Sequence, residues 1–106
     1  MADEIVILIT AGSADEASSI ARTLVDEHLA ACVNIIPGVR SFFFWEGRTQ
    51  EAAETLLVCK SRRPLLDDLS RRVKALHSYT VPEIVALPII AGLSDYLAWV
   101  NDSTKR

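Results

Sequence analysis

The sequence lacks the features that define several large classes of protein. Its formal net charge is −3 at pH 7, and acidic residues interrupt its basic stretches, so there is no basic stripe to bind a phosphate backbone. No apolar run approaches the roughly 20 residues of a membrane span. The first residues are acidic, unlike a secretory leader. We therefore expect a cytoplasmic protein that binds neither nucleic acid nor membrane.

Cysteine and glycine are also scarce. The chain has two cysteines, Cys32 and Cys59, each inside an apolar segment. No Cys-x-x-Cys spacing occurs, and a small secreted scaffold would carry more cysteines, so we interpret both as reduced, buried and inert thiols. The four glycines form no phosphate-binding loop. Because no Ser-His-Asp or Cys-His arrangement is evident either, we expect no catalytic residues and no enzyme.

The apolar content is sufficient for one packed domain. The chain has 106 residues, of which 50 % are hydrophobic and 24 % charged. A chain of this length buries a substantial core but does not divide into two, so we expect a single domain over residues 1–106. This balance of apolar and charged residues also excludes a disordered protein.

The hydrophobic pattern predicts alternating strands and helices. Ile5–Ile9 is apolar at every position, which is typical of a central strand covered on both faces. Ser13 and Glu16 form a capping box that begins a helix over Ala14–Glu27. The later elements that we expect are strands at Ala30–Ile36, Val39–Trp45, Thr55–Lys60 and Glu83–Pro88, a helix at Pro64–His77, and a short last helix that Ser94 caps and that runs through Val100.

The connections complete a fold prediction. Pro37-Gly38 is a turn dipeptide and predicts a hairpin between the second and third strands. Thr49–Glu54 is polar and is expected to be a connection, and the tail from Asp102 is expected to fray. The order indicates an α+β, ferredoxin-like β-α-β-β-α-β sandwich with a long hairpin and a short last helix.

Apolar side chains on both faces of the strands indicate association. Phe42, Phe43, Phe44 and Trp45 are consecutive, so they must point alternately to both faces of their strand. One small subunit cannot cover both faces, and an exposed patch of this size favours a binding interface. We expect a homo-oligomer with Phe42, Phe43 and Phe44 at the interface, although a monomer with one apolar edge is the alternative.

The histidines are the first candidates for a functional site. His28 and His77 each follow a helix, where an imidazole interacts well with the helix dipole, so capping is the simpler interpretation. His77 is the better functional candidate because its loop also contains Tyr79 and Glu83. Imidazole, phenol and carboxylate together could bind a metal ion or a small ligand.

Other candidates lie at the ends of strands and on the last helix. Trp45 and Glu46 end a strand, where packing and a turn are the simpler explanation and a ligand contact is the alternative. Lys60 ends a further strand. Tyr96 and Trp99 lie on the last helix and are expected in the core or at an interface.

Several motifs together resemble one known family. They are Thr10-Ala11, Leu29–Asn34 with Ile36-Pro37-Gly38, Trp45-Glu46-Gly47, His77–Ile84 and Asp95-Tyr96-Leu97-x-Trp99. In this order they resemble the CutA family of divalent-cation tolerance proteins. The resemblance implies a ferredoxin-like subunit in a homotrimer whose strands pair across subunits, and a link to copper and other divalent cations.

The resemblance also has local departures that concern the metal. Some members of the family have a cysteine where this chain has Ile9, and a second histidine where it has Leu76. Of the proposed ligand set only His77 remains, unless Cys32, Glu83 or a neighbouring subunit completes it. The resemblance therefore implies at most weak binding of Cu(II) or another divalent cation.

Three functions are consistent with the sequence. The first is a homotrimer involved in tolerance of divalent cations. The second is a trimeric small-ligand sensor, similar in architecture to PII-type proteins, and the third is a scaffold for an unidentified protein partner. For the second, the expected cleft between subunits is formed by Trp45, Glu46, Lys60, Tyr79, Glu83, Tyr96 and Trp99.

Overall fold

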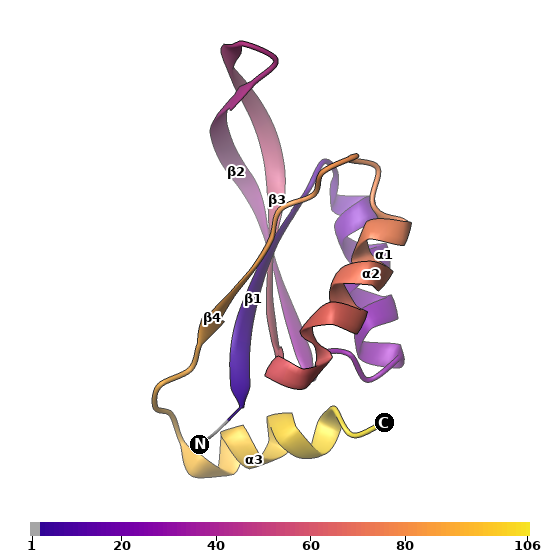
Figure 1. Ribbon diagram of the computed structural model, residues 1–106, viewed down its shortest axis with the longest axis vertical. Helices are drawn as coiled ribbons and strands as arrows, with labels where there is room; N and C mark the ends of the chain where they lie inside the picture. Colours follow the sequence, from indigo (N-terminus) through magenta and orange to yellow (C-terminus); the bar gives the residue numbers. More distant parts are fainter. Residues whose placement is uncertain (1–2) are drawn as a thin grey trace.

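The computed structural model describes residues 3–106 and shows an α+β fold with one four-stranded sheet (Figure 1). The strand order is β2-β3-β1-β4, and every neighbouring pair is antiparallel. The predicted α+β class and the predicted β-α-β-β-α-β order with a last helix are confirmed. The elements, in chain order, are β1 (Glu4–Ala11), α1 (Ala14–Asp26), β2 (Cys32–Trp45), β3 (Arg48–Arg62), a 3₁₀ turn (Arg63–Leu65), α2 (Leu66–Leu76), β4 (Ile84–Pro88) and α3 (Ser94–Ser103).

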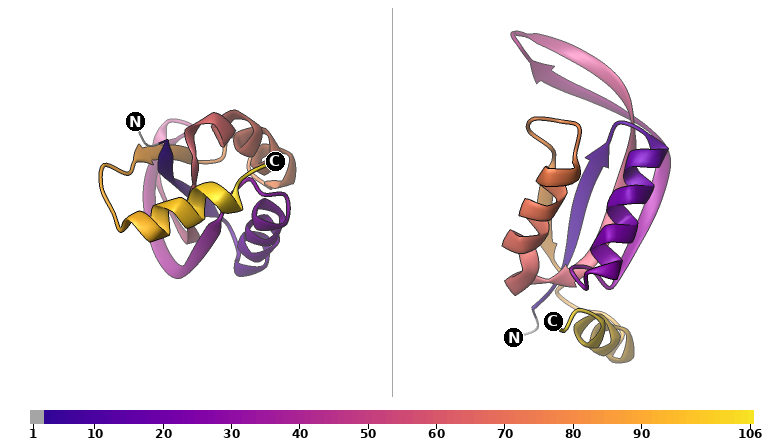
Figure 2. Two further views of the ribbon diagram at one scale, coloured as in Figure 1. Left: turned by 90° about the horizontal axis from the view of Figure 1, so that it is seen from below. Right: turned by 90° about the vertical axis from the view of Figure 1, so that its right-hand side faces the viewer.

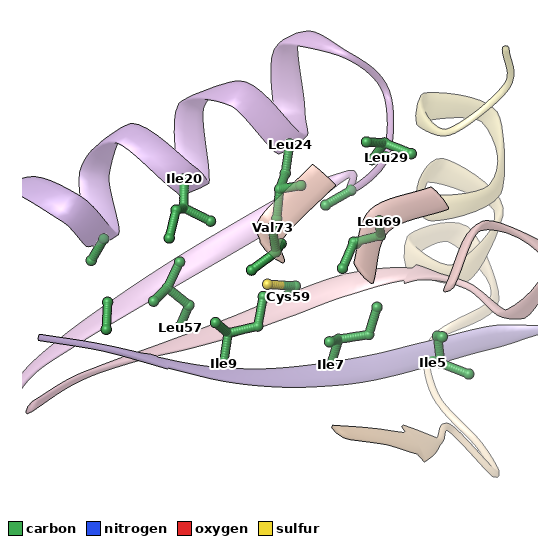
Figure 3. Packing of buried hydrophobic residues seen from close by; sticks show 13 residues of the cluster. Ile5, Ile7, Ile9, Ile20, Leu24, Leu29, Leu57, Cys59, Leu69 and Val73 are labelled. Carbon is green, nitrogen blue, oxygen red and sulfur yellow. The ribbon is translucent and has the colours of Figure 1, made fainter. Parts of the chain in front are cut away.

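The core lies between the sheet and the two helices α1 and α2 (Figure 3). Alternate residues of β1 point into it, because strand side chains alternate between faces. Ile20 and Leu24 of α1 meet them at helical spacing, and Leu69 and Val73 of α2 complete the layer. All four are fully buried. None of the helices within residues 3–106 is long and apolar enough to cross a membrane.

The hairpin differs from the prediction. Pro37 and Gly38 lie inside the continuous strand β2, and the segment expected to be a polar connection is part of β3. The pairing of β2 with β3 shifts register between Ile36 and Val39. Pro37 and Gly38, which lie between these two residues, therefore form an irregularity that bends β2. The reversal comes instead at Glu46 and Gly47, whose φ angles of 54° and 80° suit a tight hairpin turn.

The hairpin makes the molecule elongated. The chain measures 44 × 25 × 23 Å because β2 and β3 extend well past the other strands. Figure 2 shows the hairpin arching over the loop between α2 and β4. Helix α3 lies across the opposite end of the sheet (Figure 1).

The capping of α1 matches the predicted capping box. The Ser13 hydroxyl accepts a hydrogen bond from the Glu16 N–H at 3.1 Å. In return, Oε1 of Glu16 reaches back and accepts from the Gly12 N–H at 3.2 Å. The helix ends at Asp26, and His28 follows it with φ 59°, its Nδ1 lying 3.2 Å from the Ser103 carbonyl oxygen.

The C-terminal tail corrects two further expectations. Ser94 is the first residue of α3 and not its cap, and the helix continues to Ser103. The expected fraying of residues 102–104 is wrong, because Thr104 is fully buried. Arg62 explains this order: its Nε donates to the Thr104 hydroxyl at 2.8 Å and its Nη2 to the Thr104 carbonyl at 2.9 Å.

Candidate functional site

A groove separates the outer half of the hairpin from the loop that joins α2 to β4. Its volume is about 830 Å³. Figure 2 shows the hairpin above this loop. The hairpin side contributes residues 41–45 and Glu54, and the loop side contributes residues 78–83, with Thr10 between them.

The hairpin wall is aromatic on one face. Glu54 pairs with Val39 across the strands, so it shares a face with Ser41, Phe43 and Trp45. Phe43 and Trp45 are 39 % and 48 % exposed, less than the Phe42 and Phe44 side chains on the opposite face. The turn residue Glu46 is not among the residues that line the groove.

The loop wall is held from behind by His77, whose side chain is fully buried. Its Nε2 lies 2.7 Å from the Thr10 carbonyl oxygen, and its Nδ1 accepts from the Tyr79 N–H at 3.0 Å. These partners define a neutral imidazole with the proton on Nε2. The ring also packs against Tyr79, with 4.6 Å between ring centroids. Both ring nitrogens therefore serve to position the loop.

Glu16 ties the same loop to the start of α1. Its Oε2 accepts from the Ser78 N–H at 2.7 Å and lies 4.0 Å from His77 Nδ1. Burial opposes ionisation of the carboxyl, but hydrogen bonds from Ser78 and Gly12 outweigh it and lower the pKa of Glu16. The capping residue of α1 is thus also an anchor of the groove.

Tyr79 joins the two walls directly. Its hydroxyl donates to Oε2 of Glu54 at 2.8 Å. Burial, the hydrogen bond to Glu54 and the negative charges of Glu54 and Glu16 raise the pKa of Tyr79 to about 12. The phenol consequently stays protonated, and the groove carries carboxylate charge with a neutral donor.

The remaining predicted cleft residues lie away from the groove: Lys60 is on β3, and Tyr96 and Trp99 are on α3. Lys60 Nζ lies 4.0 Å from the Cys32 sulfur and hydrogen-bonds the Asn34 amide oxygen. Burial and contact with Cys32 raise the pKa of Tyr96, which stacks on Trp99 at 5.5 Å between centroids. Within one subunit, then, the predicted residues form two groups: Trp45, Tyr79 and Glu83 at the groove, and Lys60, Tyr96 and Trp99 near Cys32.

The two thiols have different surroundings. Cys59 is fully buried, and burial raises its pKa to about 12, as expected for an inert thiol. Cys32 is only partly buried. The expectation of two buried thiols therefore holds for Cys59 alone.

The described residues do not form a metal centre within one subunit. No group of three or more His, Cys, Asp or Glu side chains in residues 3–106 could hold an ion. Both nitrogens of His77 have protein partners, so an ion could bind there only by displacing one of them. Cys32 belongs to the other group of residues, so within one chain it lies apart from His77.

Sequence reasoning missed Glu54, which lines the groove, and the anchoring role of Glu16, which does not line it. Glu54 lacked a visible partner because it was assigned to a connection, whereas its position in β3 places it opposite Tyr79. The only sequence signal for Glu16 was the capping box, which does not indicate its second partner, Ser78. Both contacts join residues that are far apart in the chain.

The comparisons with known proteins agree with this architecture. The family model of the CutA1 divalent ion tolerance proteins matches residues 5–103. The chain belongs to this family. A divalent-cation tolerance protein CutA of Thermus thermophilus is 52 % identical over 95 % of this chain and 98 % of its own length. A chloroplastic CutA 1 of rice is 46 % identical over 96 % of this chain, which spans only 58 % of that longer protein.

Solved structures of the family superpose closely on the subunit. The divalent cation tolerance protein of Thermus thermophilus has a TM-score of 0.95 at 51 % identity, covering 96 % of this chain and 99 % of that one. The rice CutA1 structure has a TM-score of 0.94 at 46 % identity, covering 97 % and 94 %. The α+β fold, including the long hairpin, is therefore that of the CutA1 family.

Proposed function

We propose that this protein acts in cellular tolerance of divalent cations, as a cytoplasmic homotrimer without enzymatic activity. Membership of the CutA1 family over residues 5–103 is the observation that carries the proposal. The relatives with the same family name are called divalent-cation tolerance proteins in bacteria and archaea.

The exposed surface supports assembly. Phe42 and Phe44 are 63 % and 73 % exposed on the hairpin, and Ile90 is 94 % exposed after β4. The sheet also ends in two unpaired edges, β2 and β4, because the strand order places them outermost. Open edges beside apolar side chains favour pairing with another copy of the chain. The number three comes from the family resemblance.

We propose that the protein binds divalent cations weakly. One subunit offers His77 with both nitrogens engaged and no group of ligands around it among residues 3–106. Soft or borderline ions such as Cu(II) bind imidazole and thiolate, so His77 and Cys32 stay the candidate ligands. Any ion at His77 must compete with the Tyr79 N–H, which reduces its net affinity.

Calorimetry with Cu(II) tests this proposal. We expect a weak heat for the wild type that falls in the variant His77→Ala. His28→Ala is the matched control, because His28 is the other histidine and is exposed. Equal heats for the wild type and His77→Ala would remove His77 from the metal proposal.

A second function, small-ligand sensing, is favoured by the groove. Its volume of about 830 Å³ lies within the range of small-molecule sites, and its walls combine apolar rings with a few polar groups. The anchors Glu16 and His77 hold one wall in place without occupying the groove. Such a site is organised before any ligand arrives.

A further inference from the structure

The groove has an unusual combination of walls. One wall presents the aromatic side chains Phe43 and Trp45, and the carboxylates Glu54 and Glu83 border the same space. The described residues that line it include no lysine, arginine or histidine. We propose that the groove binds an organic cation, an alkylammonium or guanidinium group, between the aromatic wall and these two carboxylates. This inference rests on the groove being a ligand site, as proposed above.

The aromatic wall attracts cations through its ring faces. The π system of Trp, Phe or Tyr favours a cation within about 6 Å of the ring centroid, and the attraction grows when water is excluded. The hairpin already shows this contact: Cζ of Arg40 lies 5.5 Å from the centroid of the Phe42 ring. Phe43 and Trp45 share a strand face with Glu54, opposite to that of Phe42, and offer an equivalent ring surface toward the groove.

The carboxylates supply the charge. Glu54 accepts the Tyr79 hydroxyl through Oε2, and its Oε1 has no hydrogen bond among the described residues. Glu83 is exposed at the rim and forms no ion pair within residues 3–106. A charge-assisted hydrogen bond from an ammonium or guanidinium group would satisfy these oxygens.

The same walls are unsuited to a bare divalent ion. Hard cations require several oxygen ligands converging at short distance, and the described residues supply no such group. Aromatic rings provide area for a carbon-bearing cation and no ligand for a metal. The volume of about 830 Å³ also fits a molecule of many atoms better than a single ion.

Isothermal titration calorimetry of the assembled protein with spermidine tests the proposal. Triethylene glycol is the uncharged probe of comparable length, and Mg²⁺ at equal ionic strength is the probe for charge alone. We expect heat for spermidine only, and an affinity that weakens as salt is added. Glu54→Gln retains the acceptor for Tyr79 but removes the charge, and it should weaken binding about tenfold.

Two further variants separate the walls. Trp45→Leu keeps an apolar side chain but removes the ring, and should weaken binding roughly three- to tenfold. Glu83→Gln changes an exposed residue, so it tests the charge even if Glu54→Gln disturbs folding. Asp26→Asn, an exposed acid at the far end of α1, is the matched control and should alter affinity by less than about twofold.

Each outcome of these titrations either supports or overturns the binding of an organic cation. Heat with spermidine that falls in the groove variants and persists in Asp26→Asn supports the inference. Equal weakening by Asp26→Asn shows attraction to the general surface charge and overturns it. Heat with Mg²⁺ but not spermidine overturns the organic cation and leaves the groove as a ligand site, whereas heat with triethylene glycol alone replaces it with a neutral ligand. No heat with any probe overturns the inference, while the Cu(II) titration decides the metal proposal separately.

Discussion

The body of this molecule, formed by the sheet and the helices, buries its apolar residues, whereas the hairpin leaves its apolar residues exposed. In the body, Ile7, Ile20 and Leu24 are fully buried between the sheet and the helices. On the hairpin, the four consecutive aromatic side chains keep between 39 % and 73 % of their surface exposed. The body buries its apolar side chains within one chain, so these residues contribute to the stability of the fold. The aromatic side chains of the hairpin stay exposed in one chain, so they are the residues that we expect to contact a partner or a ligand.

The largest expected effect comes from breaking the body. Ile7→Ala removes a fully buried side chain from the centre of β1 and leaves a cavity. We expect a loss of about 3 to 4 kcal/mol in the free energy of unfolding. Denaturant titration measures it, with Val6→Ala, on the less buried face of the same strand, as the control. Equal losses at both positions would contradict a core confined to the helix side.

The hairpin should respond to substitution in assembly and not in subunit folding. Phe44→Asp places a charge on a side chain that is 73 % exposed. We expect the helix and strand content to persist while the proposed trimer is lost to monomer or aggregate, because apolar area at the proposed interface is removed. Light scattering measures the mass. Val25→Asp, on an exposed apolar residue of α1, should leave the assembly intact; a trimer of Phe44→Asp would refute the proposed interface.

A smaller effect on the free energy of unfolding is expected at Thr104, which joins the C-terminal tail to Arg62 of β3. Thr104→Val removes the hydroxyl that accepts from Arg62 and donates to the Val100 carbonyl oxygen at 2.8 Å. The partly buried guanidinium then loses one partner, and the expected cost is about 1 to 2 kcal/mol. Thermal unfolding measures it, and Ser103→Ala provides the neighbouring control. Unchanged stability in Thr104→Val would mean that the hydrogen bond between Thr104 and Arg62 of β3 does not stabilise the fold.

The smallest effect on the free energy of unfolding is expected at Glu16, which joins the start of α1 to the loop beside the groove. Glu16→Gln weakens the bonds to Gly12 and Ser78 and should cost about 1 kcal/mol at neutral pH. Because the pKa is lowered below its ordinary value of 4.5, the ionised carboxylate stabilises the fold above that pH. This contribution is lost as pH falls through the lowered pKa. Denaturation from pH 3 to 7 should therefore show the variant and the wild type converging in acid; a constant difference would contradict it.

Local patterns predicted most of the body and less of the groove. The capping box at Ser13 and the helical spacing of Ile20 and Leu24 identified α1 within a residue of its end. The hairpin reversal was misplaced because Pro37-Gly38 and Glu46-Gly47 are both acceptable turns locally. Only the pairing of β2 with β3 distinguishes them, and pairing is a long-range property.

The sequence by itself determined the fold class, the family and the excess of apolar surface on the hairpin. The fold class and the apolar excess follow from periodicity and composition, which act over a few neighbouring residues, and the family follows from the resemblance of the chain's motifs. Only the tertiary structure decided that Pro37-Gly38 continues a strand, that Arg62 hydrogen-bonds the buried Thr104, that Tyr79 meets Glu54 at the groove, and that Glu16 anchors the neighbouring loop. Each of these depends on hydrogen bonds or pairing between distant segments, whose geometry exists only once the sheet has formed.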